Sequence, residues 1–168
     1  MTFSIYDATV PVLTRSLGAL SGILAKGAAH AEVRKILPEV FLTARLAPDM
    51  YALTKQVQVV SDMSKGTAAR LAGVEAPSYP DDEKSFPELQ ARLAKSIDFI
   101  KGLPAAKFDG ADTREIVLNF PTGAMTFSGK DYLCQFALPN IYFHMSMAYG
   151  ILRHNGVGLA KMDFLGGV

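Results

Sequence analysis

The sequence is poor in the residues that usually mark a chemical site. Its one cysteine, Cys134, excludes a disulfide within the chain, and the surrounding YLCQFAL predicts a small buried hydrophobic residue rather than a reactive thiol. Of its three histidines, His30 and His154 are expected just beyond helix ends, as solvated or capping groups, so His144 is the one of interest. The formal net charge of +1 leaves no electrostatic footprint for nucleic acid or an anionic membrane.

Targeting segments and familiar catalytic motifs are also missing. The amino-terminal MTFSIYDATVPVL has neither a basic leader nor a sustained apolar run, and we expect no segment to reach the roughly 20 apolar residues of a membrane span. The chain contains no phosphate-binding G-K-[ST], no G-x-S-x-G, no C-x-x-C and no H-E-x-x-H. We therefore expect a cytoplasmic protein without nucleic acid or membrane partners.

What the sequence does contain is helical periodicity. Apolar residues recur every three or four positions in four segments, residues 4–26, 48–72, 86–102 and 129–154. Pro48 suits the first turn of the second segment, and Pro139 lies inside the fourth, where it predicts a kink. Over residues 114–128 the apolar period changes to two on either side of PTG, which predicts a β-hairpin.

These segments predict an all-α fold, a four-helix bundle formed by one domain over residues 1–168. The second and third helices are joined by VEAPSYPDDEKSF, a stretch with two prolines and four acidic residues. This connection is longer than the 2–8 residues usual between bundle neighbours, so it predicts a crossover between parallel helices and an up-down-down-up arrangement. The consecutive Asp81, Asp82 and Glu83 are expected to be solvated there.

A polar pair interrupts the packing residues of the fourth helix. Asn140 and His144 lie four positions apart, so they point the same way, toward the bundle interior. If the second helix is antiparallel to the fourth, Gln56 lies at the level of His144, and Asp49 lies seven residues earlier on the flank of the same apolar stripe. We therefore expect Asp49, Gln56, Asn140 and His144 to form one polar cluster that could bind a ligand.

Three interpretations of this cluster remain open. It can be a hydrogen-bond network that fixes helix register, a pocket for a small polar ligand, or a catalytic or metal site. In the first interpretation His144 is neutral, because a buried imidazolium without a carboxylate partner is disfavoured and its pKa falls below the ordinary value near 6.5.

The molecule is also expected to form a homodimer. Gln58 and Asp62 fall opposite the apolar stripe of the second helix, which suits surface or dimer-contact residues. Apolar or amphipathic side chains lie off the main stripes of the second and fourth helices, more than a monomer of this size needs to expose: Val59, Met63, Phe143 and Tyr149.

Two stretches carry a family resemblance. LAPDMYALTKQVQVVSDMSKGTAARLAG on the second helix and FSGKDYLCQFALPNIYFHMSMAYGILRHNGVGLAKMDFLG at the carboxyl end resemble an uncharacterised bacterial family catalogued as a domain of unknown function. That family is similar to the DinB/YfiT-like superfamily of four-helix bundles. The resemblance implies, for several members, a divalent metal held by one histidine on the second helix and an H-x-x-x-H pair on the fourth. For some of these it implies thiol-dependent transfer.

This chain departs from that histidine pattern. The pair on the fourth helix reads Asn140-x-x-x-His144, and residues 48–72 contain no histidine. An asparagine carbonyl is a weak substitute for imidazole at a zinc-like ion, so we expect no metal cofactor. The prediction is an uncharacterised DinB-like bundle that is non-catalytic or binds a small ligand. The alternative is a divergent metal-dependent thiol transferase-like enzyme.

Overall fold

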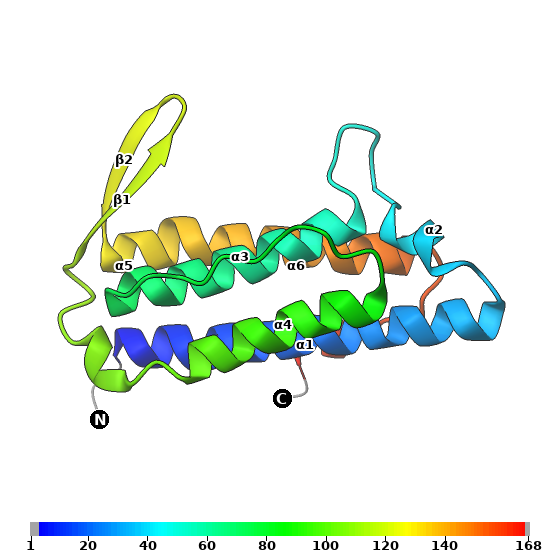
Figure 1. The fold of residues 1–168 in the computed structure, drawn as a ribbon, viewed down its shortest axis with the longest axis horizontal. Coiled ribbons are helices and arrows are strands. Elements are labelled where there is room, and N and C mark those ends of the chain that lie inside the picture. The colour runs from blue at the N-terminus through cyan, green and yellow to red at the C-terminus, as the bar shows by residue number, and fades with distance from the viewer. Residues whose placement is uncertain (1–3, 167–168) are drawn as a thin grey trace.

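The computed structural model describes residues 4–166 and contains the expected bundle (Figure 1). Its long helices are α1 (Ile5–Arg34), α3 (Leu53–Ala72), α4 (Phe86–Lys101) and α6 (Leu138–His154). Helices α1 and α6 run in one direction and α3 and α4 in the other, because the segment after α3 returns along the bundle before α4 begins (Figure 1). The predicted up-down-down-up topology, with α3 parallel to α4, is therefore confirmed.

Shorter elements complete the chain. The helix α2 (Pro38–Leu42) follows α1, and the 3₁₀ turn η1 (Ala105–Phe108) follows α4. Strands β1 (Glu115–Phe120) and β2 (Gly123–Ser128) pair antiparallel, which confirms the predicted hairpin, and they project away from the bundle (Figure 1). The helix α7 (Lys161–Leu165) lies against α1, where Asp163 forms an ion pair with Lys26.

Two helix boundaries differ from the predicted ones. Helix α1 continues past Gly27 to Arg34, because that glycine is a packing position: an added Cβ would lie 3.1 Å from Leu152 of α6. Helix α3 begins at Leu53 rather than at Pro48, which lies in the preceding turn. The first residues of the predicted second helix, including Asp49, are therefore outside it.

The last long helix is irregular just before Pro139, the proline at which we predicted a kink. Three elements run continuously from residue 129 to 154: α5 (Gly129–Asp131), the π-helical segment η2 (Tyr132–Ala137) and α6. Pro139 has no N–H and its ring crowds the carbonyl four residues earlier, so a widened turn precedes it. This turn places Cys134 at the surface, so the prediction that Cys134 is buried is wrong.

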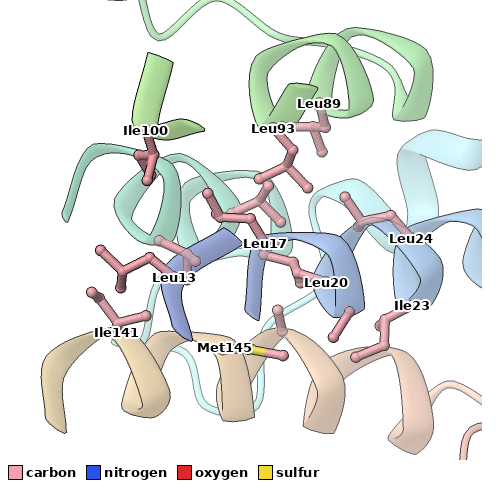
Figure 2. Close-up of a cluster of buried hydrophobic side chains, with 14 of the residues drawn as sticks. Leu13, Leu17, Leu20, Ile23, Leu24, Leu89, Leu93, Ile100, Ile141 and Met145 are labelled. Carbon is pink, nitrogen blue, oxygen red and sulfur yellow. The ribbon is translucent and has the colours of Figure 1, made fainter. Parts of the chain in front are cut away.

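The core forms where α1 passes between α4 and α6 (Figure 2). Its residues are fully or almost fully buried: Leu13, Leu17, Leu20, Ile23 and Leu24 of α1, Leu89, Leu93 and Ile100 of α4, and Ile141 and Met145 of α6. Burying each such side chain contributes about 1.5–3 kcal/mol.

By length and composition α1 could also cross a membrane, although we expected that no segment could. Half of the apolar 18-residue stretch that meets this criterion is buried inside the bundle.

The segment between α3 and α4, residues 73–85, is attached to the bundle by a buried arginine. Arg92 of α4 donates to Asp62, at 2.8 Å, to Glu83, at 2.9 Å, and to the carbonyl of Pro80, at 2.8 Å. It also contacts Asp81, at 3.0 Å, and the hydroxyl of Ser61, at 3.2 Å. These five contacts match the five N–H groups of a guanidinium.

This arginine cluster corrects the expectations for its neighbours. Asp81 and Glu83 are held by Arg92 rather than being free in solvent, and Asp62 pairs with both Arg92 and Lys65. Gln58 is buried and donates to Glu83, at 2.8 Å, so it is not a surface residue. Periodicity missed this because the crossover segment covers that side of α3.

Replacing Arg92 by Met should loosen the crossover segment. The change leaves Asp62, Asp81 and Glu83 without their shared cation, and we expect the free energy of unfolding to fall by about 2–4 kcal/mol. This range is below that of a fully buried pair because Asp62 and Asp81 remain in contact with water. Hydrogen exchange of residues 74–85 should accelerate. Lys95→Met, an exposed change on the same helix, is the control, and equal exchange rates in both variants would contradict the assignment.

The homodimer stays a prediction, and the structure sharpens its test. Phe143 is 52% exposed on α6, whereas Val59, Met63 and Tyr149 are half-buried. We expect light scattering at micromolar concentration to give twice the chain mass, and Phe143→Glu to give the monomer mass, because a charge is disfavoured in an apolar contact. A monomeric mass for the wild-type protein would rule the dimer out.

Candidate functional site

The structure brings two of the four expected site residues together. His144 of α6 points toward α3, and its Nδ1 lies 2.7 Å from Oε1 of Gln56. Gln56 is 1% exposed and His144 is half-buried, so the hydrogen bond lies at the edge of the core rather than in its centre. The antiparallel crossing of α3 and α6 sets these two residues at the same level.

The Gln56 amide also fixes which ring nitrogen carries the proton. Its Nε2 donates to the backbone carbonyl of Tyr51, at 3.1 Å, so Oε1 is the atom that faces His144. A carbonyl oxygen only accepts, which assigns the proton of the neutral imidazole to Nδ1. The lone pair of His144 is then on Nε2, the nitrogen that points away from Gln56.

Two aromatic rings flank the imidazole. Tyr51 stacks near it, with ring centroids 6.3 Å apart and planes inclined by 23°, and Phe143 meets it edge-on at 5.2 Å. Tyr51 and Phe143 are themselves 53% and 52% exposed, so together with His144 they form a partly open surface site. Burial lowers the pKa of His144 below its ordinary value near 6.5, which favours the neutral ring at pH 7.

The other two expected residues do not join this pair. Nδ2 of Asn140 donates to the carbonyl of Phe136 on its own helix, at 3.3 Å. Asp49 is exposed in the turn that precedes α3, because the helix starts five residues later than predicted. The prediction of a single four-residue cluster is therefore wrong. The pair of Gln56 and His144 instead has Tyr51 as its third member.

The remaining histidines lie elsewhere, and both are inside helices rather than just beyond helix ends as predicted. His30 is inside α1, because that helix extends to Arg34, and its ring lies edge-on to Phe41 at 5.9 Å. His154 is the last residue of α6, inside the helix rather than just beyond its end. The apolar periodicity did not indicate Tyr51 as a site residue, because Tyr51 precedes α3. Only the loop geometry places it beside His144.

Comparison with solved structures defines the class of protein. A crystal structure of a DinB family member protein from Shewanella denitrificans, at 1.83 Å resolution, matches with a TM-score of 0.91 and 38% sequence identity. The match covers 98% of this chain and 93% of that chain. No curated protein matches the sequence. The fold is thus a DinB-like helical bundle.

A family model places the chain within that class. The model described as a domain of unknown function, DUF1993, matches residues 5–165, which is nearly the whole sequence. The protein belongs to the DUF1993 family. The resemblance noted from the sequence, both to a family of unknown function and to DinB-like bundles, is confirmed.

The lowered pKa of His144 predicts a pH dependence of stability. Between that pKa and 6.5 the unfolded chain binds a proton that the folded chain does not. The stability that neutral His144 contributes to the folded state is therefore fully present above the unfolded pKa and is lost as the pH falls toward the folded pKa. In urea unfolding, the stability difference between wild type and His144→Leu should be smaller at about pH 5 than at about pH 8. A difference independent of pH would contradict the assignment.

Proposed function

We propose that the protein is a non-catalytic, small-ligand-binding DinB-like bundle in which a hydrogen bond between His144 and Gln56 takes the place of a metal centre. The observation that supports the proposal is the 2.7 Å contact between Nδ1 and Oε1, with the glutamine amide oriented by the carbonyl of Tyr51. The bond joins α3 to α6, and it holds the imidazole in one tautomer and one orientation.

The donor set does not fit the three-histidine metal site of the superfamily. One imidazole is present, its Nδ1 is engaged by Gln56, and the Asn140 amide donates to its own helix. Within residues 4–166, no group of three or more histidine, cysteine or acidic side chains could hold a metal ion. Zinc-like ions take three or four nitrogen, sulfur or carboxylate ligands, which these amides do not supply. No observation therefore favours the thiol transferase alternative.

The ligand suited to this site is small and polar, with a hydrogen-bond donor. Nε2 of His144 is an acceptor in the assigned tautomer, and the aromatic rings of Tyr51 and Phe143 lie next to the imidazole. Asn140 lies one helical turn away on the same face of α6. Such a site orients a hydroxyl, amine or thiol group.

The test compares wild type with His144→Leu and with the double variant Gln56→Met/His144→Leu. The single change leaves the buried Oε1 of Gln56 without its partner and should lower the free energy of unfolding by about 1–3 kcal/mol. The double variant removes both polar groups and should recover part of that loss. Additive losses would show that the bond has no structural role.

The same variants test metal and ligand binding. Melting curves are measured with added zinc, manganese or nickel and with low-molecular-weight thiols and polyols. We expect no metal to raise the wild-type melting temperature through His144. We expect a thiol or polyol to raise it, and His144→Leu to abolish that shift. A metal-dependent increase that is lost in His144→Leu would overturn the proposal and favour a metal enzyme.

A further inference from the structure

A hollow lies about 21 Å along α3 from Gln56, where the β-hairpin meets the bundle. Its volume is about 380 Å³, within the range of small-molecule sites. The hairpin, η2 and α3 all contribute to its walls. The lining side chains are mostly apolar or aromatic: Met63, Val117, Leu118, Phe120, Tyr132 and Phe136, with Asn119 and one cation, Arg70.

Arg70 is held in position by its surroundings rather than by an acid. Its Nη1 donates to the Tyr132 hydroxyl, at 3.2 Å, and its guanidinium carbon lies 5.9 Å from the centroid of that ring. Tyr132 is fully buried, and its hydroxyl also contacts the buried Thr67, at 3.2 Å. This chain of contacts fixes the guanidinium against a rigid aromatic surface.

Gly66 makes room for this position of the guanidinium. It lies one turn before Arg70 on α3, and a Cβ at Gly66 would be 2.8 Å from Nη1 of Arg70. Glycine in a helix interior is unfavourable by about 1 kcal/mol relative to alanine, so the helix gives up stability at this position. The absent side chain allows Arg70 to lie along α3, next to Tyr132.

The charge of Arg70 is left without an anion. None of the residues that line the hollow is acidic, and among residues 4–166 Arg70 forms no salt bridge. Arg92 is the contrast, because Asp62, Asp81 and Glu83 all contact its guanidinium. One of the five N–H groups of Arg70 donates to Tyr132, which leaves two neighbouring N–H groups to donate to a carboxylate.

We propose that this hollow binds a small organic carboxylate with an aromatic or aliphatic body, the carboxylate on Arg70 and the body among Met63, Phe120 and Phe136. One arginine without a second cation suits a monoanion, and bidentate pairing with a guanidinium suits a planar carboxylate. The apolar walls give affinity to the body, which distinguishes this ligand from an inorganic anion. The site is separate from His144, so it goes beyond the function proposed above.

The test titrates the purified full chain with 4-phenylbutyrate by calorimetry, alongside its neutral amide and acetate. Wild type should bind the carboxylate saturably, and more tightly than it binds either the amide or acetate. Arg70→Met, which removes the charge but keeps the length, should weaken binding about tenfold or more. Arg153→Met, an exposed change on α6 with the same loss of charge, and His144→Leu should both leave it unchanged.

A second variant keeps the net charge and tests the position of the guanidinium. Gly66→Ala adds the Cβ that would meet Nη1 of Arg70, so binding should weaken although the helix itself gains propensity. If Arg70→Met does not fold, the affinity of Gly66→Ala for 4-phenylbutyrate is the deciding measurement. The proposal is overturned if wild type shows no saturable binding, if acetate competes as well as 4-phenylbutyrate, or if both Arg70→Met and Gly66→Ala bind with wild-type affinity.

Discussion

The buried guanidinium of Arg92 is the constraint on which the rest of this structure depends. Its side chain is 1% exposed, and a guanidinium covered in this way is tolerated only with partners for its donors. Those partners come from α3, through Ser61 and Asp62, and from the crossover segment, through residues 80–83. The acidic segment is therefore a structural part of the bundle, and it fixes the parallel pairing of α3 with α4.

Helix α3 takes part in two polar arrangements of different kinds, one with α6 and one with η2. At one end Gln56 and His144 satisfy each other, and the amide orientation leaves one nitrogen of a neutral ring as an acceptor. At the other end Tyr132 positions Arg70, whose charge has no acidic neighbour in the hollow. The first pair stabilises a helix contact, and the second leaves an exposed guanidinium without a carboxylate partner. Each leaves one group for the ligand proposed to bind there, the Nε2 acceptor of His144 in the first and the guanidinium of Arg70 in the second.

The topology could be predicted from the sequence, because apolar periods, proline and glycine positions and loop length are local signals. The position of Gln56 at the level of His144 followed from the antiparallel crossing of the two helices alone. The start of α3 could not be predicted, since Pro48 suits a turn as well as a first helical turn. Neither could the neighbours of Arg92 or the exposure of Cys134, because long-range ion pairs and a π-helical turn leave no trace in the apolar period.

The parallel arrangement of α3 and α4 also has a consequence for how the chain folds. Helices that are adjacent in sequence usually pair first as antiparallel hairpins, but here α3 contacts α6 through Gln56 and His144, 88 residues apart. Likewise α4 meets α1 through Ser21 and Gln90, 69 residues apart. Long loops must close before these contacts stabilise anything, and non-local contacts of this kind are associated with slower folding.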